Sequence, residues 1–274
     1  MNALLDAVRS GHYAKKQIHS RSTLISWSHR GRFATGLRLA REVGGSRVLD
    51  YGSGDGTFLA MLLGSDPTPG RIKALSRPGV GSDPIQLAVG AELHRSVVED
   101  CRSRFDGDSR LRFELVDDLS RPDMQRRFDT IYCMEVFEHV VDPAPILDRL
   151  HRLLVPGGAL VISVPIETGL PLIVKQIVRT VAGWRGIGHY PGTTGYTPME
   201  LLRSVFAGSS QHITRPVFSH QDGSTFHDHK GFNWRVLRSL IAARFELIRQ
   251  TTSPVGALGP QLGTQRWFIA RKTT

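Results

Sequence analysis

Cysteine is scarce in this chain of 274 residues, which contains only Cys101 and Cys133. One lies in a segment of helical character and the other in an apolar run typical of a buried strand, so we expect two reduced, buried thiols rather than a disulfide or a metal pair. Long hydrophobic runs are missing as well: no stretch of about 18 uninterrupted apolar residues occurs, and the N-terminus lacks the charged-then-apolar order of a secretion signal. We therefore expect a cytoplasmic protein.

Acidic residues are outnumbered: 25 Asp and Glu stand against 35 Lys and Arg, which gives a formal net charge of +10. Such a charge attracts anionic partners, of which nucleic acid, acidic lipid headgroups and phosphorylated substrates are the main classes. The sign of the charge does not choose among them, and a solvated basic surface has the same composition. The hydrophobic content of 40% is enough for the packed core of one sizeable α/β domain with an insertion.

A glycine-rich turn is the most informative feature that is present. Residues 47–51 form a short β-type run closed by an acid and an aromatic residue, and residues 57–63 have the composition of a helix. Between them Gly52, Gly54 and Gly56 occupy alternate positions. Glycine adopts positive φ at little cost and lets backbone N–H groups approach a ligand, so the turn predicts a nucleotide-type cofactor at the mouth of an α/β sheet. A tight strand-to-helix turn without a ligand is the alternative.

Strand and helix patterns alternate along the chain after this turn. We expect strands at residues 47–51, 87–92, 111–116, 128–134 and 159–164, with helices between them, and a closing antiparallel pair at residues 245–248 and 267–270. This order predicts an α/β fold with a mainly parallel seven-stranded sheet, helices on both faces and an antiparallel C-terminal strand.

The remaining segments suggest a division of the chain into three parts. Residues 1–46 form a helical N-terminal extension, residues 47–165 together with 227–274 form the core, and residues 166–226 form an inserted lid or substrate-binding segment. Helices are expected at residues 170–184 and 198–206 of the insertion. The first of these is apolar and basic; we expect a buried lid helix, and a helix that lies on an anionic membrane is the alternative.

Three ordered blocks, residues 48–57, 128–140 and 153–158, resemble the class I S-adenosylmethionine (SAM) dependent methyltransferases. The resemblance covers about residues 47–165 and 229–271, and residues 133–140 with Asp142 and Pro143 are most similar to the ubiquinone-pathway O-methyltransferases. It implies a Rossmann-like fold. It also implies that SAM is held by Asp50, Gly52, Gly54 and Gly56 around its methionine part, by Glu92 at the ribose, by Asp117 (or the less well aligned Asp118) at the adenine, and by Met134 and Glu135 beside the sulfonium.

The segment after the fourth strand predicts the chemistry. If the acceptor is a hydroxyl, His139 is a candidate base and Glu138 its orienting partner, whereas a structural histidine at a helix start is the alternative. On a helix, Glu135, Glu138 and His139 would share one face and could hold Mg²⁺ or another divalent cation. A further ligand, His229, is implied by a weaker local similarity of residues 228–234 to the small-RNA 2′-O-methyltransferases. His227 and His229 lining the substrate mouth without a metal is the other interpretation.

These features support one leading function and two alternatives. The leading one is O-methylation of a small, lipid-linked or glycan-type acceptor, with peripheral contact to an anionic membrane as an option. Methylation of RNA at a 2′-hydroxyl is the second enzymatic reading, because the net charge and the His229 segment favour it. A non-catalytic SAM-binding assembly factor is the alternative from another class.

Overall fold

The structure, a computed structural model, describes residue 8 and residues 23–64, 84–184, 194–220, 223–254, 259 and 263–273. Seven strands form one sheet in the order β3-β2-β1-β4-β5-β9-β8. Only β9 runs antiparallel to its neighbours, β5 and β8, and the other paired strands are parallel. The strands are β1 (Arg47–Tyr51), β2 (Leu87–Glu92), β3 (Leu111–Leu115), β4 (Phe128–Met134), β5 (Leu154–Pro165), β8 (Glu246–Ser253) and β9 (Gln265–Arg271).

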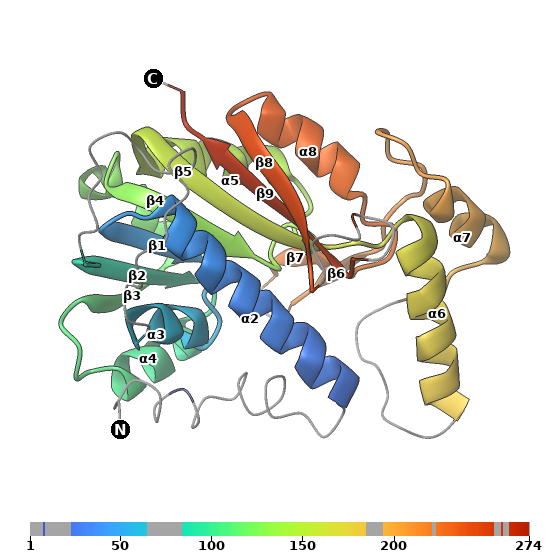
Figure 1. The fold of residues 1–274 in the computed structure, drawn as a ribbon, viewed down its shortest axis with the longest axis horizontal. Coiled ribbons are helices and arrows are strands. Elements are labelled where there is room, and N and C mark those ends of the chain that lie inside the picture. The colour runs from blue at the N-terminus through green and yellow to red at the C-terminus, as the bar shows by residue number, and fades with distance from the viewer. Residues whose placement is uncertain are drawn as a thin grey trace.

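Helices cover both faces of this sheet (Figure 1). The apolar side chains of α2, α3 and α4 form one core cluster with Trp267 and Ile269 of β9. Those of α5 and α8 form a second cluster with the alternate residues Phe268 and Ala270. Successive strand residues point to opposite faces, so one apolar strand supplies both cores. These helices are α2 (Thr23–Val43), α3 (Thr57–Gly64), α4 (Arg95–Arg104), α5 (Pro143–Leu153) and α8 (Trp234–Ala242).

The central strands bring their carboxyl ends to one edge of the sheet. In the parallel register Asp50 of β1 lies opposite Gly90 of β2 on one side and Tyr132 of β4 on the other. β1, β2 and β4 all end at this edge, so the loops that follow these three strands begin side by side. In open α/β sheets this edge, where the strand order reverses, is the place where ligands bind.

The predicted fold class is confirmed, with two local corrections. β3 ends at Leu115, because Val116 begins a short 3-10 helix. β5 begins at Leu154 rather than Ala159 and thus includes Pro156, Gly157 and Gly158. It does so because Gly157 and Gly158 exchange backbone hydrogen bonds with Lys272 just beyond β9, at 3.0 and 2.9 Å. Cys101 in α4 and Cys133 in β4 are buried free thiols, as predicted.

The segment after β5 contains two helices and a small hairpin. These are α6 (Gly169–Trp184), α7 (Pro198–Val205), and the antiparallel strands β6 (Val217–Ser219) and β7 (Thr225–His227). No helix among the described residues is long and apolar enough to cross a membrane. The proposed boundaries of the extension and insertion stay predictions, and residues 1–22 apart from Val8 lie outside the described part.

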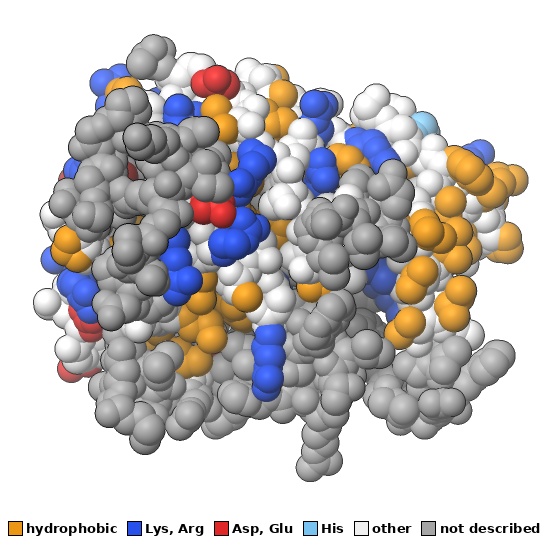
Figure 2. All heavy atoms as spheres, viewed as in Figure 1, with side chains coloured by type: hydrophobic (Ala, Val, Ile, Leu, Met, Phe, Trp, Pro, Cys, Tyr) orange, Lys and Arg blue, Asp and Glu red, His pale blue; other side chains and the backbone are white. Residues whose placement is uncertain are grey.

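The expectation that α6 is buried is wrong. Its apolar side chains at positions 170, 173, 174, 177 and 178 are exposed, with 48% exposure at Leu170 and 59% at Ile177. Together with the exposed Met199, Leu202 and Phe206 at α7 they form what we call the α6–α7 apolar surface, visible at the right of Figure 2. The opposite side of α6 faces inward, because Lys175 and Arg179 bind the buried carboxylate of Glu167.

Candidate active site

The loop from β1 to α3 forms the floor of a cavity of about 590 Å³ at the carboxyl edge of the sheet. Gly52, Gly54 and Gly56 all have positive φ, between 56° and 78°. The amides of Gly52 and Ser53 donate to the carbonyl of Ala91, at 2.8 and 3.2 Å, which ties the loop to β2. The hydroxyl of Ser53 is buried without a hydrogen-bond partner. The loop is therefore fixed against β2, and the Ser53 hydroxyl remains able to bind a ligand in the cavity.

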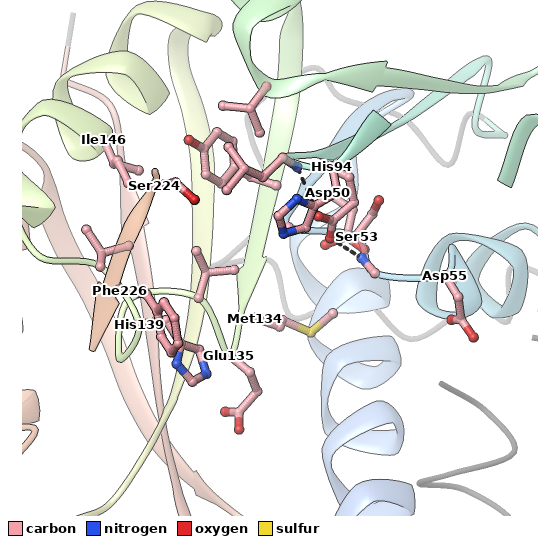
Figure 3. Close-up of a pocket in the computed structure, with 18 of the residues that line it drawn as sticks. Asp50, Ser53, Asp55, His94, Met134, Glu135, His139, Ile146, Ser224 and Phe226 are labelled. Carbon is pink, nitrogen blue, oxygen red and sulfur yellow. Dashed lines mark hydrogen bonds between the residues drawn. The ribbon is translucent and has the colours of Figure 1, made fainter. Parts of the chain in front are cut away.

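The rest of the cavity wall comes from segments far apart in the sequence. Phe226 of β7 and His139 lie on one side, Asp50 and His94 on the other, and Met134 and Glu135 between them (Figure 3). The wall also includes Val136, Val140, Val141 and Ile146, which make it largely apolar at the side nearer the hairpin. Pockets with apolar walls and a few placed polar groups are typical of small-molecule sites.

Two predicted cofactor residues, Asp50 and Glu92, lie at adjacent strand ends and line the cavity. Asp50 is 2% exposed, and its Oδ1 has no hydrogen-bond partner. Burial, reinforced by the nearby charge of Glu92, raises the pKa of Asp50 to about 8. Glu92 accepts hydrogen bonds from the amides of Gly54 and Leu93, at 2.6 and 3.0 Å. Glu92 thus holds the glycine loop and β2 together, and it ends the strand rather than opening α4, which begins at Arg95.

Asp117, the predicted adenine residue, lies at the margin of the site. It is exposed in the 3-10 helix Val116–Ser120. Its neighbour Val116 lines the cavity, whereas neither Asp117 nor Asp118 is among the lining residues. The assignment of adenine recognition to Asp117 stays a prediction.

Near the end of β4, the guanidinium group of Arg32 lies beside carboxyl groups of the cavity. Glu135 has φ of 59°, and its Oε2 lies 3.5 Å from an Nη1 of Arg32. Arg32 belongs to α2, is 4% exposed and lines the cavity beside Asp50. Sequence analysis missed Arg32, because helical spacing alone does not show which of several arginines on one helix turns inward.

The structure contradicts the helix expected at Glu135, Glu138 and His139. The positive φ of Glu135 turns the chain away from β4, and a single hydrogen-bonded turn follows, in which the amide of His139 donates to the carbonyl of Val136 at 2.9 Å. Glu138 is fully buried, and neither of its carboxyl oxygens has a hydrogen-bond partner. Burial and the nearby Glu135 raise the pKa of Glu138 well above its usual value.

A different set of potential ligands comes together instead. Ligand atoms of Glu138, His139 and His229 all lie within 4.8 Å of one another, and Glu135 is not part of this group. The imidazole rings of His139 and His229 have centroids 5.0 Å apart. The long-range pairing with His229 was predicted, whereas the helical face that was to supply Glu135 does not exist.

His139 is oriented by backbone rather than by Glu138. Its Nδ1 lies 2.9 Å from the carbonyl oxygen of His227. Since a carbonyl only accepts, Nδ1 carries the proton and Nε2 of the neutral ring keeps a lone pair. Burial lowers the pKa of His139, which favours this neutral form near pH 7.

Glu167, just after β5, is a second group that sequence analysis missed. Its Oε1 lies 2.8 Å from Nζ of Lys175, 3.4 Å from Nη2 of Arg179 and 3.8 Å from Nδ1 of His229. Burial would raise the pKa of Glu167, but Lys175 and Arg179 hold it at about 2. The ion pair fixes the start of α6 next to His229.

The fold and this cavity define a class of protein: an α/β domain built to bind a nucleotide-type cofactor at the carboxyl edge of its sheet. The chain matches the methyltransferase domain family over residues 26–203, and it belongs to that family. This confirms the family predicted from the glycine-rich loop and the segment after β4.

Curated relatives share the segment that carries these motifs. The chain is similar to ubiquinone biosynthesis O-methyltransferases of Pseudomonas aeruginosa LESB58 (29% identity over 119 residues), Azotobacter vinelandii (32% over 123) and Xylella fastidiosa 9a5c (37% over 123). The alignments cover 43%, 44% and 43% of this chain and 44%, 45% and 42% of the relatives. The chain therefore matches less than half the length of these relatives.

Solved structures share the fold at low sequence identity. A protein from Pyrococcus horikoshii OT3 superposes with a TM-score of 0.54 at 12% identity, over 96% of this chain and 97% of that one. An S-adenosylmethionine dependent methyltransferase described as putative, from Listeria monocytogenes, gives 0.52 at 12% identity, over 90% and 100%. These likenesses establish the Rossmann-like fold.

Proposed function

We propose that this protein transfers a methyl group from SAM to a hydroxyl of a small, lipid-linked or glycan-type acceptor. The observation that carries the proposal is the polar lining of the cavity floor. Asp50 Oδ1 and Ser53 Oγ are buried without partners, and a Cβ at Gly54 would meet no atom within 4 Å. Unpaired buried polar groups beside open space fit a cofactor that brings its own donors and acceptors.

Different residues of the cavity would hold different parts of SAM. Asp50 and the Gly52–Gly54 backbone would hold the methionine part, Glu92 the ribose hydroxyls, and Met134 and Glu135 the region of the sulfonium. SAM supplies a methyl group on a positively charged sulfur. Carboxyl groups around the cavity, with Arg32 as their counter-charge, suit a cationic centre. The apolar wall at Val136, Val140 and Val141 would exclude water from the transfer.

We assign His139 as the base. Its backbone-anchored Nδ1 leaves Nε2 free to accept the acceptor's proton, and it lines the same cavity as the loop. The imidazolium formed would stay anchored by Nδ1–H on the carbonyl of His227. Glu138, first expected to orient His139, would instead face the developing positive charge from its buried position. Positioning and proton removal supply most of the acceleration that such a displacement needs.

A divalent cation held by Glu138, His139 and His229 is the second candidate for the same chemistry. The two unpartnered oxygens of Glu138 beside two imidazoles form a donor set that fits such an ion. Two nitrogen ligands favour a zinc- or manganese-type ion over Mg²⁺. When bound, the ion would lower the pKa of an acceptor hydroxyl. The chain's own residues would then act as ligands, and His139 would not be the base.

The names of the curated relatives and the α6–α7 apolar surface both favour a lipid-linked acceptor. Those relatives are named as O-methyltransferases of ubiquinone biosynthesis. An exposed apolar surface of this kind, on a chain with net charge +10, suits peripheral contact with an anionic membrane. Replacing Ile177 by Glu would remove vesicle binding without touching the cavity, whereas unchanged binding would rule out this surface.

A methyl-transfer screen tests the function. Labelled SAM is incubated with lipid, glycan and RNA extracts, using the wild-type protein, His139→Ala, and His151→Ala as a matched control on α5. We expect label in the lipid or glycan fraction and a loss of about 100-fold or more in kcat for His139→Ala only. Label in RNA alone would favour RNA 2′-O-methylation, and SAM binding without transfer to any fraction would favour an assembly factor.

Metal dependence separates the two mechanisms at the same site. Activity that survives a chelator unchanged assigns His139 as the base. Activity that is lost with chelator and restored by manganese or zinc, but not in Glu138→Gln, assigns the three-residue ion site. The SAM affinity measured by calorimetry serves as the control. It should not change, because neither the proposed base nor the proposed ion site includes the glycine loop.

A further inference from the structure

Two arginine side chains lie over the Trp234 ring on the α8 side of the sheet, and a third, Arg238, lies close enough for its charge to act on one of them, Arg266. Arg235 and Arg238 lie in the first turns of α8, and Arg266 lies in β9. The Cζ atoms of Arg235 and Arg266 lie 4.4 and 4.9 Å from the centre of the Trp234 ring. Arg238 follows Trp234 by four residues, which places both on the same side of the helix. We call this set the arginine cluster.

The partners of the cluster are neutral. Arg235 donates to the hydroxyl of Thr168 at 3.0 Å, and Arg266 donates to the amide oxygen of Gln250 at 2.9 Å. Within the described ranges, none of the three guanidinium groups forms an ion pair with a carboxylate. The residues that join β8 to β9 in the sequence, 255–262, include no Asp or Glu. Like charges are therefore held together without an ion-pairing acid among the residues that the structure describes.

Holding these guanidinium groups together is electrostatically unfavourable. Burial lowers the pKa of Arg266, and the charges of Arg238 and Arg235 lower it further. α8 has no acid in its first turn, so the positive end of the helix dipole adds to the repulsion. Two buried donors, Nε1 of Trp234 and Nε of Arg266, have no acceptor, and Trp234 is only 6% exposed. An anion with several acceptor oxygens would offset the charge repulsion and the helix dipole, and it would offer acceptors to the unpaired donors.

We propose that the arginine cluster is a binding site for a phosphate group, separate from the methyl-transfer cavity. Guanidinium forks match the oxygens of phosphate in geometry and charge, and Arg238 is exposed at the cluster, which leaves the site open to solvent. The ligand is either a soluble phosphate or phosphate ester, or the phosphate of a lipid headgroup. The proposal does not depend on the identity of the methyl acceptor.

Thermal unfolding in inorganic phosphate, against sodium chloride at equal ionic strength, tests the site. At about ten times the dissociation constant, phosphate should raise the Tm of the wild-type protein by about 3 °C or more. Arg238→Gln and the double variant Arg238→Gln/Arg266→Gln should lose at least half of this shift. Arg271→Gln, at the other end of β9, removes the same charge elsewhere and should keep it. An equal shift in all four proteins, or none in any, would overturn the proposal.

Arg238→Gln also distinguishes a binding site from a structural one. Because it removes a repelling charge from an exposed position, its Tm without phosphate should equal or exceed that of the wild type. A lower Tm would mean that Arg238 stabilises the fold and would count against the site. This single variant keeps the test valid if the double variant fails to fold.

Vesicles identify the source of the phosphate. Phosphatidylglycerol and phosphatidylcholine vesicles are compared with glycerol phosphate as soluble probe, again in wild type, Arg238→Gln and Arg271→Gln. Binding to phosphatidylglycerol that only Arg238→Gln loses assigns a lipid headgroup. A response to glycerol phosphate alone, lost in the same variant, assigns a soluble ester. Binding that Arg238→Gln leaves unchanged refutes both.

Discussion

At the scale of single residues, the three glycines of the loop have different physical roles although their spacing treats them alike. A Cβ at Gly52 would come within 2.3 Å of Val136, and one at Gly56 within 2.7 Å of Phe113. Gly52 and Gly54 both line the cavity, but of the three glycines only Gly54 faces open space. Gly52 and Gly56 are thus required by packing, whereas Gly54 is required by the space that a ligand would fill.

Gly54→Arg and Gly56→Ala should therefore separate binding from folding. The arginine side chain would fill the cavity, so we expect SAM affinity to fall by about 100-fold or more, or about 2.8 kcal/mol, while the positive φ at this position costs the fold about 1–2 kcal/mol. Gly56→Ala would collide with the Phe105 and Phe113 rings and should lower the free energy of unfolding by about 1–3 kcal/mol. Calorimetry and urea unfolding measure the two effects, and a Gly54→Arg protein with unchanged SAM affinity would contradict the cofactor site.

Asp50 should make the protein less stable as pH rises. With a pKa of about 8 in the folded state against 3.8 for the free group, the native protein binds more protons than the unfolded chain between these values, so wild-type stability falls with pH. Asp50→Asn does not titrate. Its advantage in urea unfolding should grow by up to about 4 kcal/mol from pH 5 to pH 8, while SAM binding weakens at both. An advantage that is the same at both pH values would show that Asp50 is ionised in the fold.

At the scale of secondary-structure elements, the sequence predicts what depends on local pattern and fails where a distant contact decides. The strands follow from apolar runs, and β2 ends at Glu92 as expected. The spacing from Glu135 to His139 also suits a helix, but the positive φ of Glu135 gives a turn. The inward turn of Arg32 depends on Glu135, and the outward face of α6 depends on the buried Glu167. No local pattern contains those pairings.

Asp129 shows how one side chain joins two elements. At the start of β4 it accepts hydrogen bonds from the amides of Ser46 and Arg47, at 3.1 and 3.0 Å, and pairs with the Arg47 side chain. Burial raises the pKa of Asp129, but these bonds outweigh burial and lower it below 3.8. The stabilisation is therefore complete above pH 3.8 and is lost as pH falls through the lower folded-state pKa.

Asp129→Asn should cost about 1–3 kcal/mol in urea unfolding at pH 7 and pH 5. The gap to the wild type should close as the pH falls through the lowered folded-state pKa of Asp129, because both side chains are neutral below it. Asp148→Asn, which removes a surface carboxylate paired with Arg244, serves as the control and should change little. A gap that persists undiminished at low pH would mean that shape, not charge, makes Asp129 important.

At the scale of the whole molecule, the net charge of +10 has structural consequences beyond attraction to partners. Many acids are already engaged in ion pairs, as Glu42 is with Arg38 and Arg249. In the described part of the chain, the arginine cluster has no such partner. Exposed pairs contribute about 0–1 kcal/mol each, so the uncompensated positive charge should decide how salt acts on the fold.

Raising sodium chloride from about 0.01 to 0.15 M should therefore raise the Tm, because the screening length falls from about 30 to 8 Å and repulsion weakens more than the short, partly buried pairs do. Arg238→Gln should show a smaller rise than the wild type, since part of the repulsion is already gone. Arg244→Gln removes a charge that is attracted to Asp148 at 2.6 Å, and its rise should be at least as large as that of the wild type. Calorimetric scans of the three proteins across this range measure the effect. A Tm that falls with salt would show that ion pairs outweigh net repulsion in this fold.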